Sequence, residues 1–352
     1  MSTVRSIGRR IAATPELGLI VIVVLLCATL TVFAGSHVDR ETGMTVNNFW
    51  NSNTLIQTAT DASFFAIMAI GATMVIISGG IDLSVGSIYA LSGVSLGLAM
   101  RAMPPMGGAA TVLTGLVICC GVGLLCGLLN GALVVGLRVH PFIITLGTMW
   151  VLRGIAFVAT KAESILVPES LTDFTKASLG LGNNLYPVPM LAMILLTVLG
   201  AIYLRRTVMG RHIFAFGGSL EASRFAGLRL GRIQLGVYAL SGLTAGIAAF
   251  LGATFYGSAS SGDGQGYELY VIASAVVGGA SLLGGKGSAV GGTLGAILIV
   301  LIRQSIRTLH FDQNYEWIVI GCAIIAAVVV DQWSSRMTTR RLARVAESKA
   351  AT

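Results

Sequence analysis

Residues 110–137 read ATVLTGLVICCGVGLLCGLLNGALVVGL, and none of these positions carries a charged side chain. An α-helix needs roughly 17–25 apolar residues to cross the ~30 Å hydrocarbon layer of a membrane. Similar apolar runs recur along the chain and indicate ten candidate spans: 17–34, 54–78, 85–100, 110–137, 142–160, 189–204, 233–255, 269–283, 288–302 and 317–330. The pattern predicts an all-α, polytopic membrane bundle of these ten transmembrane helices, forming one domain over residues 1–352.

The composition excludes an ordinary soluble domain. Hydrophobic residues make up 55% of the 352 residues and charged residues 11%, against roughly 45–50% and about 25% in soluble domains. The 45 glycines fit a membrane bundle, because glycine lets helix backbones approach closely in lipid. The run 17–34 resembles a signal peptide, but it is longer than the roughly 7–15 residues of a signal core and is predicted to stay as a helix.

Basic residues indicate the orientation, since Lys and Arg in short loops favour the cytoplasmic side. With the N-terminus inside, sixteen of the 23 basic residues fall in cytoplasmic segments: Arg5, Arg9, Arg10, Arg138, Arg205, Arg206, Arg211, Arg224, Arg229, Arg232, Lys286, Arg336, Arg340, Arg341, Arg344 and Lys349. Six fall outside, at Arg40, Arg101, Lys161, Lys176, Arg303 and Arg307. Both termini are therefore predicted in the cytoplasm, with 1–16 as the N-terminal segment, 205–232 as an inner loop and 331–352 as a basic tail.

The motifs of common enzymes and metal sites are missing from the sequence. The nearest approach to a phosphate-binding loop has Gly287, rather than Ser or Thr, after Lys286. No HExxH or Gly-x-Ser-x-Gly motif occurs, and the five cysteines lie in apolar segments without metal-type spacing. The net charge of +8 comes from short clusters rather than a continuous basic face, which does not favour nucleic-acid binding. We expect no catalytic residues, no metal and no cofactor in this chain.

Ionisable residues inside apolar spans point to function or to pairing, because charges are costly in lipid. Asp61 lies near the outer end of its span, where it faces either the solute path or only an aqueous vestibule. Arg153 lies eleven residues past Phe142, roughly 16 Å along a helix and close to the midplane. Two interpretations of Arg153 remain open: a buried pair with a carboxylate, Asp82 or Asp61, or contact with substrate hydroxyls.

Asp82 lies in the sequence SGGIDLSVGS, residues 78–87. Glycine pairs interrupt helices, and non-helical backbone at membrane depth is tolerated only against protein or a water-filled cavity. Asp82 and Ser84 are therefore candidates for the translocation path or its gate. The alternative is that one of them caps the helix that resumes at Val85.

Residues 79–87 resemble the signature of permeases from the ribose, xylose and galactose class of ATP-binding-cassette (ABC) importers. Further matches follow in the family's order: 146–149 with Arg153 and Gly154, 210–218 through Ala222 to Gly227, 238–243, and 267–269 leading to 277–285. The resemblance covers roughly residues 50 to 330. It implies the permease of a bacterial inner-membrane importer that carries a monosaccharide, a pentose or a hexose, from periplasm to cytoplasm.

The same resemblance implies three partners for a chain that is itself no enzyme. These are a cytoplasmic ATPase that binds ATP and Mg, a periplasmic sugar-binding protein, and a second permease copy that is either identical or paralogous. Related permeases move nucleosides or other small polar solutes, which remain alternatives to a sugar. Outside this family, an ion-coupled secondary transporter would need a relay of buried acids, for which only Asp61 and Asp82 qualify. A membrane scaffold or receptor would not need broken helices.

The inner loop contains GGSLEASRFAG, which predicts a short helix bounded by glycines. Ser219 is the predicted N-cap, Glu221 lies in the first turn, and Gly227 ends the helix in a left-handed conformation. Such a helix is too short to be stable alone, so something must pack against it. In the resembling family this region docks on the ATPase, which makes the following residues candidates for coupling: Gly217, Gly218, Ser219, Leu220, Glu221, Ala222, Ser223, Arg224, Phe225, Ala226 and Gly227. The alternative is packing on the permease's own inner surface.

A short internal sequence similarity adds Glu268 to the candidates for the translocation path. Residues 80–85 and 266–271 share Gly, an acid, Leu and Val at matched offsets. The predicted topology places Asp82 at an inner break and Glu268 at an outer one, as an inverted repeat would.

Overall fold

The computed structural model describes residues 15–38, 43–180, 185–326, 328–329 and 332. Within these ranges eight helices are long and apolar enough to cross a membrane: α2 (Pro15–Phe33), α3 (Ser52–Ile77), α4 (Val85–Ala102), α5 (Gly108–Leu137), α6 (Pro141–Thr160), α8 (Val188–Arg206), α11 (Leu230–Tyr256) and α13 (Ala289–Thr308). The predicted helical, polytopic membrane bundle is confirmed. The cytoplasmic placement of residues 1–14 and 333–352 lies outside the described residues.

Shorter elements complete the described chain. The short helices are α7 (Glu169–Thr175), α9 (Val208–Gly218), α10 (Leu220–Phe225), α12 (Tyr267–Val277) and a last helix at Tyr315–Ala326. β1 (Ser36–Val38) pairs antiparallel with β2 (Thr45–Asn47). β3 (Ile165–Leu166) pairs antiparallel with β4 (Ser258–Ala259), which ties the loop after α6 to the end of α11.

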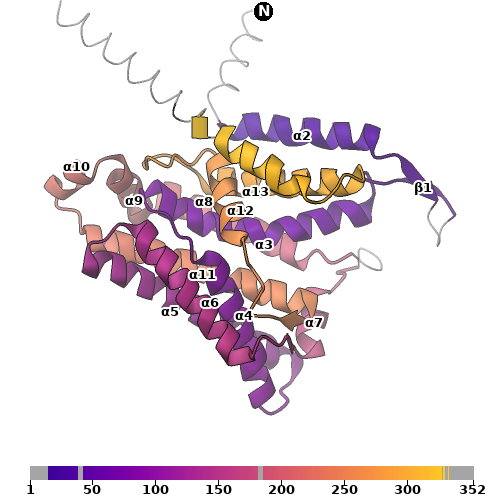
Figure 1. Cartoon of the computed structure of the whole chain (residues 1–352), viewed down its shortest axis with the longest axis horizontal. Helices are drawn as coiled ribbons and strands as arrows, with labels where there is room; N and C mark the ends of the chain where they lie inside the picture. Colours follow the sequence, from indigo (N-terminus) through magenta and orange to yellow (C-terminus); the bar gives the residue numbers. More distant parts are fainter. Residues whose placement is uncertain (1–14, 39–42, 181–184, 327, 330–331, 333–352) are drawn as a thin grey trace, which may run out of the picture.

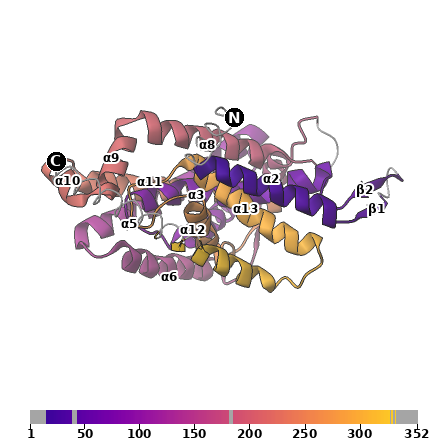
Figure 2. The same cartoon turned by 90° about the horizontal axis from the view of Figure 1, so that it is seen from above.

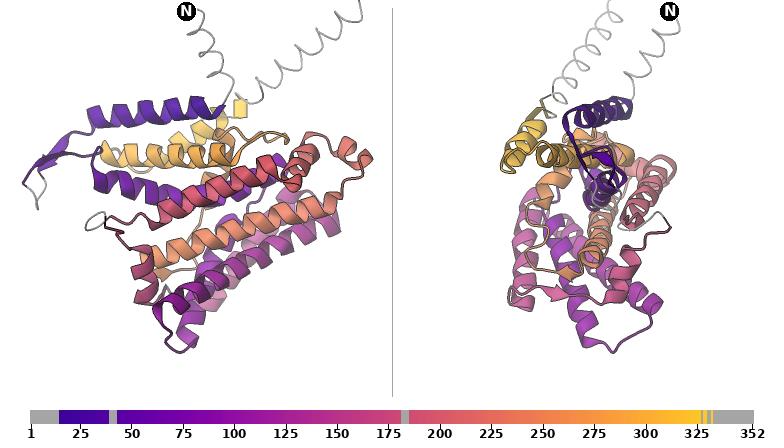
Figure 3. Two further views of the ribbon diagram at one scale, coloured as in Figure 1. Left: turned by 180° about the vertical axis from the view of Figure 1, so that it is seen from behind. Right: turned by 90° about the vertical axis from the view of Figure 1, so that its right-hand side faces the viewer.

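The long helices form two groups that are inclined to one another. In Figure 1, α2, α13 and α3 run nearly parallel, while α4, α5 and α6 cross below them at an angle. Helix α11 packs on α3, α4 and α5 and so joins the groups, which Figure 3 shows from behind. The β1–β2 hairpin and the α9–α10 pair lie at opposite ends of the structure (Figure 2), as expected for an outer and an inner loop.

The core is built around α3. In the most apolar 18-residue stretch of α3, 94% of the residues are buried inside the structure, whereas 22% are buried in the corresponding stretches of α6 and of α8. Protein therefore encloses α3, whereas α6 and α8 form the periphery of the chain. Helices α5 and α11 touch backbone to backbone, because a Cβ added at Gly123 would overlap the carbonyl oxygen of Gly242, and one added at Gly242 would overlap that of Gly123. Small residues at a crossing permit this approach.

The predicted span 269–283 is wrong as one continuous helix. Helix α12 ends at Val277, and the chain then turns through Gly279 at a φ of 89°. Before α12, residues 261–266 form turns, and the chain runs along α4 from Ala259, beside Gly93, to Gly264, beside Gly86. Gly86 and Gly93 are seven residues apart, or about 10 Å along the helix. The crossing therefore joins a non-helical part to a short helix.

Candidate functional site

Asp82 lies enclosed in the turn between α3 and α4, with 2% of its surface exposed. Its Oδ1 accepts hydrogen bonds from the backbone N–H (3.0 Å) and the hydroxyl (2.6 Å) of Ser84, and its Oδ2 accepts one from the Ser241 hydroxyl (2.8 Å). The Ser84 hydroxyl in turn accepts a bond from the Asn130 amide (2.7 Å). These bonds tie the start of α4 to α5 and α11, so Asp82 braces the break in the chain.

Capping of α4 by the Ser84 side chain, one form of the alternative for this break, is wrong. Ser84 occupies the N-cap position of α4, but within the described structure its side chain bonds no N–H of the first turn. Asp82 bonds Ser84 itself, which precedes the helix. Neither residue lines the polar cavity that is described next. A role for Asp82 and Ser84 in a gate stays a prediction.

A cavity of about 560 Å³ lies between α4, α6, α12 and the last helix. Four polar side chains line it: Ser87, Arg153, Gln265 and Glu268. Three aromatic side chains complete the wall: Trp150, Phe157 and Trp317. Trp150 and Trp317 are 69% and 58% exposed, so the cavity opens at the surface between α6 and the last helix. Of the five predicted path residues, the structure brings two together here, Arg153 and Glu268.

Arg153 is anchored by backbone carbonyl groups rather than by a salt bridge. Its Nη1 donates to the carbonyl oxygens of Ser261 (2.8 Å) and Asp263, both in the non-helical segment before α12. The carboxylates that act on it electrostatically are Glu268 and Asp263. The expected pairing with Asp82 or Asp61 is therefore wrong. Arg153 holds the non-helical segment in place, because a buried guanidinium satisfies carbonyls that have no helical partner.

Two polar groups of the cavity lack hydrogen-bond partners among the described residues. They are the Ser87 hydroxyl, on a residue with no exposed surface, and the Glu268 Oε2. Glu268 lies in the first turn of α12, and its Oε2 lies against Gly86, where a Cβ would come within 2.6 Å of it. An unpaired buried acceptor is costly in a folded protein and calls for an explanation.

Helices α4 and α12 begin side by side and run apart. Gly86 in the first turn of α4 lies against Gly264, just before α12. From this point α4 runs to Ala102, whereas α12 ends against the start of α13, with Gly278 touching Gly291. Two helix starts at one level with opposite directions are what an inverted repeat requires. The repeat itself stays a prediction.

The short helix predicted in the loop 205–232 is confirmed as α10. The Ser219 hydroxyl accepts a bond from the Ala222 N–H (3.2 Å), and Gly227 follows at a φ of 73°, in the left-handed region that disfavours other residues. Along α10 only Ser223 is buried, while Phe225 is 90% exposed. Helix α10 thus packs on its own chain through one side, and the exposure of its other side chains favours docking of a partner over the alternative that it packs only on its own chain.

Comparison with known proteins places the chain in a transporter family. The family model described as branched-chain amino acid transport system / permease component matches residues 54–328. This chain belongs to that family. Among similar proteins, the permease is 34% identical to the fructose import permease protein FrcC of Rhizobium meliloti, over 81% of this chain and 79% of the relative.

Two further relatives have the same kind of description. The permease is 35% identical to the ribose import permease protein RbsC of Escherichia coli (strain K12), over 81% of this chain and 87% of the relative. It is 33% identical to the autoinducer 2 import system permease protein LsrD of Photorhabdus luminescens, over 85% and 92%. No solved structure matches. Membership in a family of transport permeases means that the chain is not itself an enzyme and argues against the scaffold and secondary-transporter alternatives.

In the permease, the end of α9 packs closely against the backbone at the end of α3 and in the loop after α12; we call this contact the Gly217 junction. A Cβ added at Gly217, in the last turn of α9, would overlap the carbonyl oxygen of Ile77, the last residue of α3. The same oxygen accepts a hydrogen bond from the Gly285 N–H (2.8 Å), in the loop between α12 and α13. The end of α9 therefore touches the chain just before the Asp82 break and just after α12.

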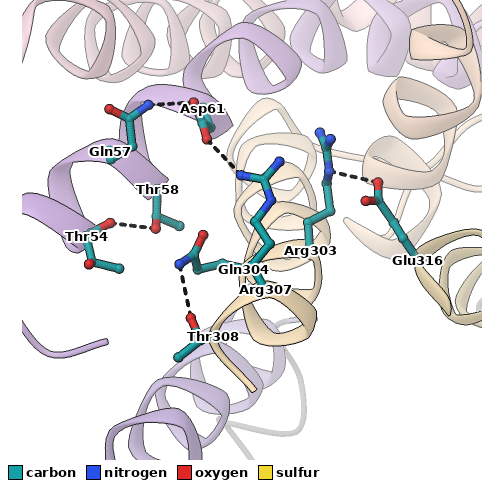
Figure 4. A network of polar contacts seen from close by, with 9 residues as sticks. All are labelled: Thr54, Gln57, Thr58, Asp61, Arg303, Gln304, Arg307, Thr308 and Glu316. Carbon is teal, nitrogen blue, oxygen red and sulfur yellow. Dashed lines mark hydrogen bonds and ion pairs between the residues drawn. The ribbon is translucent and has the colours of Figure 1, made fainter. Parts of the chain in front are cut away.

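A second polar cluster joins α3, α13 and the last helix of the permease (Figure 4). Asp61 accepts a bond from the Gln57 amide (2.9 Å) and lies 3.8 Å from Arg307 Nη1. Arg303 Nε lies 2.8 Å from Glu316 Oε1. The placement of Arg303 and Arg307 in an outer loop was wrong, because α13 continues to Thr308. Their spacing of four residues puts both on one helix face, a signal that could have revealed the cluster.

Arg303 is the centre of this cluster. Its guanidinium lies over the rings of Phe65 (5.7 Å) and Tyr270 (5.3 Å), and the Tyr270 hydroxyl donates to Glu316 Oε1 (2.6 Å). The side chains of Arg303 and Glu316 are 24% and 14% exposed. The cluster connects α3, α12 and α13 to the last helix, and Asp61 belongs to it rather than to the cavity.

We expect Arg303→Ala to lower the thermal stability of the purified permease, by about 1–3 kcal/mol, because it leaves the largely buried Glu316 carboxylate without its cation. Arg307→Ala is the matched control, since the Arg307 side chain is 47% exposed and its ion pair is long; its effect should stay within about 1 kcal/mol. Unfolding followed in detergent measures both. Equal losses in the two variants would contradict the bracing role of Arg303.

Proposed function

We propose that this protein is the permease subunit of an ATP-driven importer that carries a monosaccharide across the bacterial inner membrane into the cytoplasm. The observation that carries the proposal is its similarity, over most of their length, to permeases described as importing fructose and ribose. The eight long apolar helices provide the membrane-spanning body. The cavity between α4, α6 and α12 provides a polar route for a solute inside that body.

The exposed surface of α10 supports docking of a cytoplasmic ATPase. A helix of this length is not stable by itself in water, and here it presents Leu220 (51% exposed) and Phe225 (90% exposed) to the outside. The Gly217 junction, at the end of the adjoining helix α9, connects α10 to α3 and to the loop before α13. ATP and Mg belong to that partner in this proposal, and a periplasmic binding protein delivers the sugar.

The open side of the cavity supports a second permease copy. Arg153 and Glu268 line a cavity whose mouth lies beside strongly exposed apolar side chains of α6, Trp150 and Val158 (81% exposed). A charged cavity that opened directly to lipid would be costly. A second copy, identical or paralogous, would cover this face and close the route.

Reconstitution in proteoliposomes with the ATPase and the binding protein tests the function. Sugar uptake should require ATP on the side of the membrane to which the ATPase is bound. It should not respond to ionophores that collapse ion gradients. Uptake by the permease alone, driven by a sodium or proton gradient, would contradict the proposal and would favour a secondary transporter.

Ala222→Trp and Ala226→Trp should each abolish ATPase association, because both positions are exposed on the α10 segment and a bulky ring there blocks close docking. Uptake should fall with association, while the amount of permease in the membrane stays constant. Ala109→Trp, at an exposed position in α5 far from α10 in sequence and fold, is the control. Co-purification of the ATPase is the measurement, and normal association in both α10 variants would place the docking surface elsewhere.

A further inference from the structure

The cavity between α4, α6 and α12 is lined by two buried polar groups that have no hydrogen-bond partner among the described residues. Ser87 has no exposed surface, and its hydroxyl lines the cavity without a partner among the described residues. Glu268 Oε2 is likewise unpartnered. Buried polar groups in native structures are usually hydrogen-bonded, and among the unpartnered groups of the described chain these two line the cavity, where a ligand can reach them.

We propose that this cavity binds one neutral monosaccharide ring during translocation, with Glu268 and Ser87 as hydrogen-bonding groups and Trp150 and Trp317 against its apolar faces. The inference rests on the proposed sugar import, and it assigns a binding site within the permease itself. Sugar rings combine hydroxyl groups at the rim with C–H faces. A wall of aromatic rings with a few convergent polar groups suits such a ligand.

Arg153 completes the polar set. Its two described hydrogen bonds both come from Nη1, to the carbonyls of Ser261 and Asp263. They fix the guanidinium in position, and the N–H groups of Nε and Nη2 remain as donors to a ligand. Glu268 accepts and Arg153 donates, so a ring with adjacent hydroxyl groups can use both.

The charge balance favours a neutral ligand. One carboxylate and one guanidinium line the cavity, so a phosphorylated sugar would meet the Glu268 carboxylate with like charge. A zwitterionic amino acid could place its ammonium group on Glu268 and its carboxylate on the remaining N–H groups of Arg153, but it lacks the additional hydroxyl groups that a sugar ring offers to Ser87, and titration with leucine decides between the two ligands. The volume of about 560 Å³ lies within the roughly 300–1,000 Å³ of small-molecule sites.

Tryptophan fluorescence of the full-length permease in nanodiscs, without ATPase, tests the site, because Trp150 and Trp317 line it. Titration with a panel of pentoses and hexoses, including ribose and fructose, should give a saturable change with at least one sugar. Ribose 5-phosphate and leucine should give none. Glu268→Gln should weaken that binding by about tenfold, because a charge-assisted hydrogen bond is lost. Ser87→Ala should weaken it by about fivefold, because the lost hydrogen bond is between neutral groups.

Ser92→Ala is the matched control. Ser92 lies on the same helix, is fully buried, and also has a hydroxyl without a partner in the described chain, but it is not part of the cavity lining. Binding should be unchanged in this variant. Equal weakening in Ser87→Ala and Ser92→Ala, saturation by leucine, or no saturable change with any sugar would overturn the proposal.

ATP-dependent uptake in reconstituted membranes separates this inference from the function on which it rests. Uptake without any saturable binding to the permease overturns the site and leaves the importer intact. Absence of ATP-dependent uptake for every sugar in the panel overturns the proposed function as well.

Discussion

Gly217→Ala is expected to reduce sugar uptake at least tenfold while the ATPase still associates. The added Cβ would overlap the carbonyl oxygen of Ile77 and lie 2.7 Å from the Gly285 nitrogen. Backbone atoms cannot rotate out of the way as a side chain can, so α9 would have to move away from α3. Overpacking of this kind costs about 1–3 kcal/mol, and here it would separate the end of α9, which carries α10, from the two breaks that α9 contacts.

Gly218→Ala is the matched control for this junction. It lies next to Gly217 in the same helix, but a Cβ added there meets no atom within 4 Å. Both changes raise helix propensity equally, so a difference in uptake reports the contact alone. ATPase co-purification and uptake are measured on both variants. Equal uptake in the two would show that the junction does not transmit the motion of α10.

Arg153→Ala is expected to lower the yield and thermal stability of the permease strongly. Removal of the guanidinium leaves the carbonyls of Ser261 and Asp263 without their donor and the Glu268 carboxylate without its nearest cation. Each buried carbonyl group left without a donor typically costs about 1–3 kcal/mol. The non-helical segment before α12 should then lose its fixed conformation.

Arg205→Ala provides the comparison for this loss. Arg205 also pairs with an acid, Glu16, but the distance is 3.6 Å and the Arg205 side chain is 65% exposed. Exposed ion pairs contribute little, so yield and melting temperature should stay close to those of the unchanged protein. Size-exclusion profiles and unfolding in detergent measure both variants. Normal stability of Arg153→Ala would mean that the segment is held by other contacts.

Long apolar helices could be predicted from the sequence because hydrophobicity over a full crossing is a local property. The run 110–137 became α5 (Gly108–Leu137), and 54–78 became α3 (Ser52–Ile77). The α10 helix was also local, since its cap at Ser219 and its end at Gly227 depend on neighbouring residues. The family likewise followed from short motifs, which the comparison with known permeases confirmed.

The partners of Arg153, Arg303 and Asp82 could not be predicted in this way. Each contacts a residue in another element of the fold: the Ser261 and Asp263 carbonyls, the Glu316 carboxylate in the last helix, and the Ser241 hydroxyl in α11. Residue type identifies a charge that must be compensated, but it does not identify which helix lies beside it. That depends on packing, which only the folded chain determines.

The sequence by itself determined that this protein is a helical membrane permease, where most of its helices lie, and that a glycine-rich break precedes Val85, because each follows from local hydrophobicity and backbone freedom. Only the tertiary structure decided that the start of α12 lies beside the start of α4, that Arg153 and Glu268 share a cavity while Asp82 lies apart from it, and that Gly217 touches Ile77. These are contacts between distant segments, and they arise from the close fit of helices that no local pattern encodes.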